Sequence, residues 1–322
     1  MFAGPATARD TMGGPDSADR AGLVDRDPVV RRLFAAVRAL IRIGYFSFEV
    51  EGVEHLPREG PVVYAQNHSG WFPLDAFFLT FAIAEAQGLE RAPYFATVDA
   101  ALETPGLRAL LSRFGALPAS SFRRPERLPP AVQSVGIFPE GVRGNCKPFW
   151  YAYRLRDFNR GFVRVAVTRR APVVPTAILG GEECLPVAWT VRFLEPLIGS
   201  ILPLPLSLVP LPARWKIIFH DPIHLDAPPE AVTDHAYCSS VARRVQGIVQ
   251  ATLDREARER PVSRLAALLA GTKPVATALP DPEDPLAEPA PSEEGPGGQG
   301  AEQLEERDEE RANGRVPEIP SL

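Results

Sequence analysis

The sequence of 322 residues predicts an α/β fold in which a mixed, largely parallel sheet is flanked by helices. Two observations predict it. Short apolar segments with strand composition alternate with segments whose apolar residues recur at helical spacing. Hydrophobic residues make up 45% of the chain, enough to bury the core of one large domain. We expect this domain at residues 28–270, with its core at 51–226, between a disordered N-terminus (1–27) and a disordered acidic tail (271–322).

The first predicted element is an amphipathic helix from Pro28 to about Phe46. Its apolar residues recur at helical spacing, while three arginines share another face. Pro28 suits the first turn of a helix, and Asp27 can cap it. Basic residues beside a bulky apolar stripe are typical of a helix at a membrane interface. An ordinary surface helix packed on the core fits equally well, so both interpretations stay open.

The remaining elements follow in the alternating order of an α/β sheet. Strands are predicted at residues 61–66, 134–138, 172–179, 190–194 and 215–219, and helices at 74–87, 106–114, 160–169 and 229–259. In open α/β sheets, ligands bind where strands end. His68 and Glu140 each follow a predicted strand, so this pattern predicts a site that contains both.

Residues 196–212 form an apolar, uncharged stretch that five prolines interrupt. Proline removes a backbone donor, so this stretch is predicted to be neither a regular helix nor a central strand. It is either a buried connection or an exposed loop that dips into lipid. Because loops usually run over the surface, the second interpretation is slightly favoured.

Charge is distributed unevenly along the chain. The formal net charge is −5, but residues 271–322 hold 4 Lys and Arg against 13 Asp and Glu, a charge of −9. The rest has 31 basic against 27 acidic residues and is therefore mildly basic, at +4. This balance suits an anionic ligand or an anionic membrane surface, and it is too small to indicate nucleic-acid binding.

The cysteine spacing and the hydropathy of the sequence argue against a disulfide-rich, zinc-binding or membrane-spanning protein. Cys146, Cys184 and Cys238 are too widely spaced for a disulfide framework or a zinc cluster. We therefore expect a reduced, cytoplasmic setting and no metal. No N-terminal signal pattern and no run of about eighteen apolar residues occurs, so no transmembrane helix is predicted.

Candidate catalytic groups lie just after the predicted strand at 61–66. His68 can act as a general base toward a hydroxyl. Asp75 can fix the tautomer of the imidazole and stabilise its protonated form. Downstream, Arg143 offers a planar fork of donors for a phosphate. A His and Asp pair occurs by chance in many chains, so the ordered combination with the later Glu and Arg carries the prediction.

In these residues the chain resembles the PlsC-like glycerolipid acyltransferases, over roughly Glu51 to Asp226. Four blocks match in the family's order: Asn67-His68 through Asp75, Phe114-Gly115-Ala116-Leu117-Pro118, Phe138-Pro139-Glu140-Gly141-Val142-Arg143, and Val173-Val174-Pro175. The third block is the most specific, since it is similar to the family's Phe-Pro-Glu-Gly-Thr-Arg. Two features depart from the family pattern. Six residues rather than four separate His68 from Asp75, and the second block has no arginine shortly after its glycine.

The resemblance implies transfer of a fatty acyl group from acyl-CoA or acyl carrier protein to the hydroxyl of a lysophospholipid or related glycerolipid. It implies that His68 and Asp75 are catalytic, that no cofactor is needed, and that the protein works peripherally on the inner face of the membrane. The residues implied to bind substrate are Asn67, Phe138, Pro139, Glu140, Gly141, Arg143 and Lys147. A lipid-binding scaffold without turnover is the alternative, and a thioesterase that uses the same pair is a further possibility. For Arg154, Arg156, Arg160 and Arg164, contact with CoA phosphates and a solvated helix face stay equally open.

Overall fold

The computed structural model describes residues 27–191, 201–258 and 260–263, all within one compact unit, Met1–Leu286. Its main sheet has seven strands in the order β1-β9-β6-β2-β5-β3-β4. The strands are β1 (Phe46–Glu51), β2 (Val62–Gln66), β3 (Tyr94–Thr97), β4 (Ala116–Pro118), β5 (Ser134–Ile137), β6 (Val173–Leu179) and β9 (Ala213–Phe219). Neighbouring strands are parallel except β6 and β9. The predicted mixed, largely parallel sheet is therefore confirmed.

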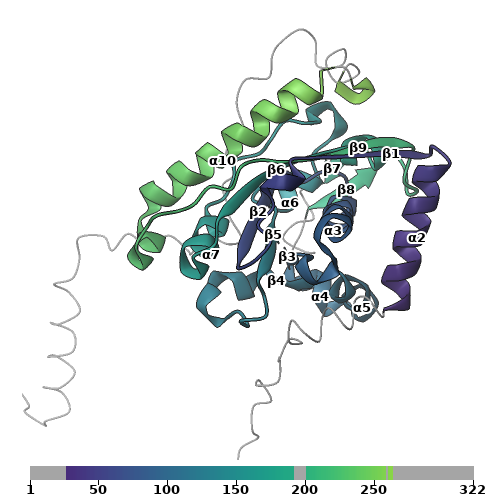
Figure 1. Ribbon diagram of the computed structural model, residues 1–322. Coiled ribbons are helices and arrows are strands. Elements are labelled where there is room, and N and C mark those ends of the chain that lie inside the picture. The colour runs from purple at the N-terminus through teal and green to yellow at the C-terminus, as the bar shows by residue number, and fades with distance from the viewer. Residues whose placement is uncertain (1–26, 192–200, 259, 264–322) are drawn as a thin grey trace, which may run out of the picture. The chain divides into compact units, whose positions relative to one another are not determined.

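Helices cover both faces of this sheet (Figure 1). One face packs against α7 (Gly161–Arg169) and α10 (His235–Glu256), and the other against α2 (Pro28–Arg42) and α3 (Leu74–Gln87). The shorter helices are α4 (Asp99–Glu103), α5 (Pro105–Arg113), α6 (Val142–Asn145) and α8 (Gly181–Cys184). All residues of β2 and β6 are buried, as expected for parallel strands covered on both sides.

The N-terminal helix begins as the sequence predicts but ends earlier. The Asp27 side chain accepts hydrogen bonds from the backbone N–H groups of Val29 and Val30. Burial raises the pKa of its carboxyl, but these hydrogen bonds lower it, and the net pKa is below the usual value. The helix ends at Arg42, because Gly44 adopts a positive φ of 75° and the chain turns into β1. The prediction that the helix continues to Phe46 was therefore wrong. No described helix is long and apolar enough to cross a membrane.

The C-terminal helix is also shorter than predicted. α10 begins after Asp234, whose side chain accepts a hydrogen bond from the backbone N–H of Tyr237. Residues Pro229–Thr233 form a separate 3-10 turn. The predicted tails lie outside the described residues, apart from Asp27 in the N-terminal range.

A second sheet contains β7 (Val187–Val191) paired antiparallel with β8 (Leu202–Pro205). The predicted strand at 190–194 is thus shifted toward the N-terminus, and its residues 192–194 lie outside the described residues. The described part of the proline-rich stretch, from Ile201 onward, forms neither a helix nor a strand of the main sheet, as predicted. Its large apolar side chains are exposed from Leu202 to Leu211.

All three cysteines are free and buried, which makes a testable prediction about their reactivity. Burial raises the pKa of the Cys146 and Cys184 thiols to about 12 and also raises the pKa of Cys238. Because the thiolate is the reactive form, the native protein should react only slowly with iodoacetamide at pH 8, and the unfolded protein should react at all three thiols. Mass spectrometry of the alkylated chain measures this. Rapid labelling of the native protein would show that one thiol is accessible and ionised.

Candidate active site

The candidate site lies at one edge of the sheet, where β2 and β5 end. These strands are parallel neighbours, so their carboxyl ends meet at the same edge. One residue separates His68 from the end of β2, and two residues, Phe138 and Pro139, separate Glu140 from the end of β5. The carboxyl end of β6 lies beside that of β2 and leads into α8. The fold thus brings together the segment that contains His68 and the segment that contains Glu140.

His68 and Asp75 form a direct hydrogen-bonded pair. His68 Nδ1 lies 2.6 Å from Asp75 Oδ2. Asp75 is fully buried, and its carboxylate also accepts hydrogen bonds from the backbone N–H groups of Ser69 and Ala76. It lies in the first turn of α3, where the helix dipole favours a negative charge. These contacts fix the imidazole with Nδ1 toward the carboxylate.

The longer spacing between His68 and Asp75 is accommodated by the turn between them. Gly70 adopts a φ of 80°, a left-handed conformation that favours glycine. The Leu74 N–H donates to the Phe72 carbonyl at 2.7 Å, and α3 then begins at Leu74. Asp75 is thereby returned to His68 in spite of the six intervening residues.

The other ring nitrogen of His68 is available for chemistry. Among the residues that the structure describes, none forms a hydrogen bond with His68 Nε2. The His68 side chain is 12% exposed, so the ring is largely shielded from water without being sealed off. Phe138 stacks on it with ring centroids 4.0 Å apart and planes at 25°. A fixed ring with one unoccupied nitrogen is what a general base requires.

Glu140 holds the backbone around His68. Its side chain is buried, with Oε1 accepting a hydrogen bond from the His68 N–H at 2.8 Å and Oε2 accepting one from the Arg156 N–H at 2.7 Å. One carboxylate thus joins the chain after β2, the turn after β5 and the segment that leads to α7. The predicted contact of Glu140 with substrate stays a prediction, while the contacts seen here are structural.

Lys147 belongs to the same buried charge cluster. Its Nζ lies 3.5 Å from Glu140 Oε2 and 3.5 Å from Glu182 Oε1, and its side chain is 1% exposed. Burial raises the pKa of the Glu182 carboxyl, and the nearby Lys147 ammonium opposes that rise. The one ammonium offsets the charge of only one of the two carboxylates, in line with the raised pKa of Glu182.

Gly141 and Arg143 of the third block lie at the start of α6, after the turn that follows β5. Gly141 has φ 60° and ψ −159°, a backbone conformation that is essentially restricted to glycine. It allows the chain to turn into α6 at Val142. Gly144 lets this helix approach the histidine, because a Cβ added there would lie 3.1 Å from His68 Cβ. Arg143, one residue earlier on this short helix, is partly exposed. The structure therefore places an arginine on the helix that packs on His68.

Asn67 lies between two strands of the main sheet. It is fully buried, its Nδ2 donates to the Ile178 carbonyl at 2.8 Å, and its Oδ1 accepts from the Ile178 N–H at 2.7 Å. In this conformation the amide bridges β2 to β6. A contact between Asn67 and substrate stays a prediction that these bonds do not favour. Pro139 is likewise buried and accepts hydrogen bonds from Asn159 at its carbonyl.

The four arginines between residues 154 and 164 do not share one helix face. Arg156 is 9% exposed and lies over the Tyr151 ring at 5.3 Å, whereas Arg164 lies on α7 and donates to the Arg123 carbonyl. The second family block contains β4, the outermost strand of the sheet beside β3. Two strands, β5 and β3, separate it from β2, which leads to His68.

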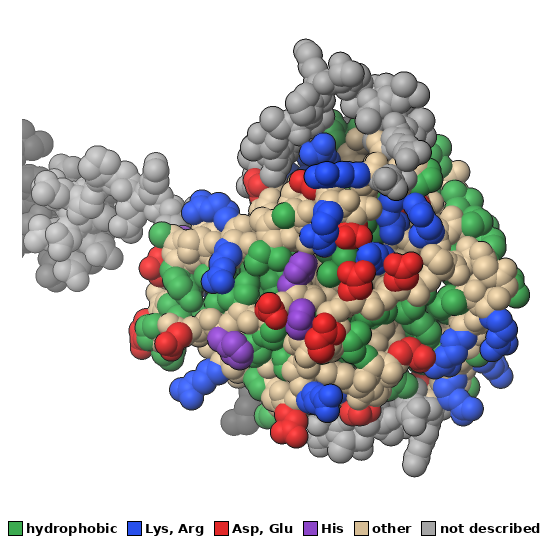
Figure 2. Space-filling view, turned by 45° about the horizontal axis from the view of Figure 1, so that its top comes forward, with side chains coloured by type: hydrophobic (Ala, Val, Ile, Leu, Met, Phe, Trp, Pro, Cys, Tyr) green, Lys and Arg blue, Asp and Glu red, His purple; other side chains and the backbone are tan. Residues whose placement is uncertain are grey.

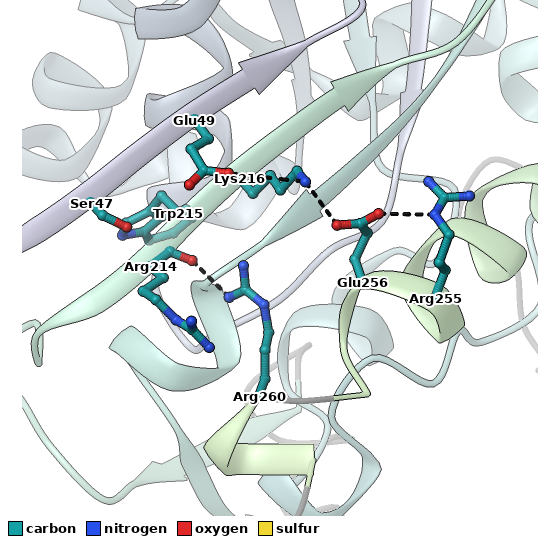
Figure 3. Close-up of a pocket in the computed structure, with 8 residues that line it drawn as sticks. All are labelled: Ser47, Glu49, Arg214, Trp215, Lys216, Arg255, Glu256 and Arg260. Atoms are coloured by element: carbon teal, nitrogen blue, oxygen red, sulfur yellow. Dashed lines mark hydrogen bonds and ion pairs between the residues drawn. The ribbon is translucent and has the colours of Figure 1, made fainter.

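A polar pocket of about 270 Å³ lies elsewhere, beside β1, β9 and the end of α10 (Figure 3). Its charged groups are largely paired with one another: Lys216 with Glu256 at 2.8 Å and Arg255 with Glu256 at 2.9 Å. Arg260, at its rim, reaches Glu183 next to the buried cluster at 3.0 Å. This pattern is typical of a structural ion network that ties α10 to the sheet.

Two contributors to the site were missed at the sequence level. Glu182 follows β6, so the same strand-end rule that selected His68 and Glu140 could have found it. Gly181 makes room for the catalytic turn, because a Cβ there would lie 2.2 Å from Ser69 Oγ. That close approach joins segments more than 100 residues apart, and no local pattern signals it.

Comparison with known proteins agrees with this site. Residues 47–179 match the model of the family described as Acyltransferase, and this range includes both motif segments. The uncharacterized protein Rv0502 of Mycobacterium tuberculosis is 35% identical over 202 residues, which are 59% of this chain and 56% of that protein. The uncharacterized protein ML2427 of Mycobacterium leprae is 32% identical over 235 residues, 69% of this chain and 64% of that protein. The chain thus spans less than two thirds of the length of these relatives.

A solved structure is also similar. The crystal structure of the 1-acyl-sn-glycerophosphate (LPA) acyltransferase PlsC from Thermotoga maritima aligns with 76% of this chain and 88% of that chain, with a TM-score of 0.47 and 16% sequence identity. With the motif order and the pairing of His68 with Asp75 in place, residues 47–179 form a domain that is similar to the Acyltransferase family.

Proposed function

We propose that this protein transfers a fatty acyl group from a thioester, either acyl-CoA or acyl carrier protein, to the hydroxyl of a lysophospholipid or related glycerolipid. One observation carries the proposal: His68 Nδ1 is bound to the buried Asp75 at 2.6 Å, while no described residue bonds with Nε2. An imidazole held in this way can accept a proton at Nε2 and share the resulting charge with the carboxylate.

The reaction is direct transfer without an acyl-enzyme. His68 Nε2 takes the proton of the acceptor hydroxyl while the oxygen attacks the thioester carbonyl. The tetrahedral intermediate then collapses, the C–S bond breaks, and the thiolate leaves with the proton from the imidazolium. Ser69 is not the nucleophile in this scheme. Its side chain is fully buried and its backbone N–H donates to Asp75, so it stabilises the turn.

Arg143 is the proposed contact for a phosphate on the acceptor. It lies on the short helix that packs against His68, and guanidinium binds phosphate through two parallel hydrogen bonds. The buried Glu140 and Lys147 serve instead to position His68, because the Glu140 carboxylate accepts the His68 N–H and contacts the Lys147 ammonium.

An acceptor panel tests the proposal. The full chain is incubated with radiolabelled acyl-CoA or acyl carrier protein and lysophosphatidic acid, other lysophospholipids or diacylglycerol, and labelled lipid is separated and counted. Arg143→Gln should raise the KM for phosphate-bearing acceptors by about 10-fold or more, since a hydrogen bond to a charged group contributes about 1.5–3 kcal/mol. The KM for diacylglycerol should not change.

The panel has two informative failures. If no acceptor receives label from either donor, the proposed transfer is wrong and the lipid-binding alternative is favoured. If Arg143→Gln affects all acceptors equally, the phosphate contact is wrong while the transfer activity stands.

A further inference from the structure

The sheet formed by β7 and β8 carries a row of exposed apolar side chains that the active site does not use. We call residues Val187–Val191 and Leu202–Leu211 the apolar ribbon. Neither segment contains a charged residue. Its exposed large side chains are Trp189, Leu202, Leu204, Leu206, Leu208, Val209 and Leu211, of which Leu208 is 77% exposed. A contiguous apolar patch of this kind marks an interaction surface.

Trp189, Leu202 and Leu204 share one face of the sheet formed by β7 and β8. Trp189 is paired across the two strands with Leu204. Leu202 and Leu204 are exposed, and the alternating Pro203 and Pro205 are only partly exposed, which places the leucines on the same face. Elsewhere the surface differs: basic and acidic side chains are interspersed on the face seen in Figure 2. The ribbon, by contrast, contains no charged residue.

Both parts of the ribbon are bonded to the two catalytic segments. In β7, the Thr190 hydroxyl donates to the Cys146 carbonyl at 2.6 Å, directly after the helix that carries Arg143. Beyond β8, the Ser207 carbonyl accepts a hydrogen bond from Trp71 Nε1 at 3.0 Å, in the turn between His68 and Asp75. The apolar surface is therefore fixed beside the catalytic turn.

From these contacts we infer that the apolar ribbon docks on a phospholipid bilayer and sets the active site at its surface. Charge supports a bilayer, because exposed arginines flank the uncharged ribbon. Arg214 follows it closely in sequence, and Arg42 lies at the end of α2, near where Tyr45 donates to the Pro210 carbonyl at 2.7 Å. Basic groups around an apolar patch that contains a tryptophan suit anionic headgroups.

The free edge of β8 argues against a strand from another protein. The Leu206 N–H donates inward to the Pro186 carbonyl, and strand alternation places the nitrogens of Pro203 and Pro205 on the outer edge. Proline nitrogens carry no hydrogen, so this edge cannot donate to an added strand. A partner therefore meets the apolar face, and lipid needs no backbone pairing there.

The inference rests on the proposed function, because acceptors with long acyl chains reside in bilayers and the enzyme must reach them there. Its test does not depend on catalysis. Partition of the full chain into vesicles of phosphatidylcholine and phosphatidylglycerol, without acyl donor or lysolipid, is measured by co-sedimentation. The double variant Leu206→Asp/Leu208→Asp should lower the partition coefficient by about 10-fold or more, as expected when apolar burial in the membrane interface is lost.

A matched control and a local probe complete the experiment. Val53→Asp also places a charge on a partly exposed apolar position, but after β1, at the opposite edge of the sheet, and should leave partition unchanged. Vesicles with brominated acyl chains should quench tryptophan fluorescence, and Trp189→Phe should remove most of that quenching.

Three results would overturn the inference. One is unchanged partition in the double variant, and another is an equal loss in Val53→Asp. The third is a dimer in vesicle-free solution, detected by light scattering, that the double substitution dissociates, because the ribbon would then bind a second copy. If vesicle binding depends on the ribbon but no acceptor is acylated, the docking surface stands and the proposed function fails.

Discussion

Replacing His68 with alanine should lower the kcat of acyl transfer by about 10²–10⁴-fold, the usual contribution of a general base. The expectation follows from the geometry at the end of β2. The ring is fixed by Asp75 on one side and by the Phe138 ring 4.0 Å away, and no described residue bonds with Nε2. Alanine at this position removes the proposed base for the attacking hydroxyl.

The Asp75→Asn substitution tests the contribution of the carboxylate in the His68–Asp75 pair. Each oxygen of the Asp75 carboxylate accepts a backbone N–H, from Ser69 at Oδ2 and from Ala76 at Oδ1. Either orientation of an asparagine amide therefore points an NH₂ group at an N–H donor. We expect a loss of kcat of up to about 10⁴-fold, as in hydrolase triads. The double variant should be no slower than His68→Ala, because the two residues act together.

Initial rates at saturating acceptor measure these effects, with His224→Ala as the matched control. His224 is exposed and lies beyond β9, at the opposite edge of the sheet from His68, so its variant should keep wild-type activity. A His68→Ala protein that folds and retains full kcat would show that another group is the base.

A long apolar helix could be predicted from the sequence, whereas short strands could not. The helix at 74–87 was predicted at its observed bounds, because its apolar composition extends over almost four turns. Strands β3 and β4 have four and three residues, too few for a periodicity to be recognised. They gain their stability from pairing with neighbours, and that pairing involves residues distant in sequence.

The site divides in the same way. His68, Asp75 and the turn from Phe138 to Arg143 follow from local motifs and strand ends. The role of Glu140 could not be predicted, because it depends on the Arg156 backbone and on Lys147 and Glu182 in the folded chain. A motif records which residue is present. It does not record whether the side chain faces substrate or the protein interior.

Glu140 therefore provides the second large expected effect. Glu140→Ala removes the acceptor of two backbone N–H groups and leaves Lys147 with one carboxylate fewer in a buried cluster. Breaking a buried charged contact typically costs about 3–5 kcal/mol, so we expect the free energy of unfolding to fall by about that amount. Urea unfolding followed by circular dichroism measures it, with the exposed Glu103→Ala as the control that should change little.

Glu140→Gln separates positioning of the base from binding of the acceptor. The amide keeps the volume of the carboxylate, but its NH₂ group must face the N–H of either His68 or Arg156, a mismatch that costs about 1–3 kcal/mol. A displaced His68 backbone misaligns Nε2, so kcat should fall while the KM for the acceptor stays near wild type. If instead the KM rises and stability is unchanged, Glu140 contacts the acceptor, as the family resemblance implies. The first outcome is the expected one, because both oxygens of the buried Glu140 carboxylate already accept a backbone hydrogen bond inside the folded chain.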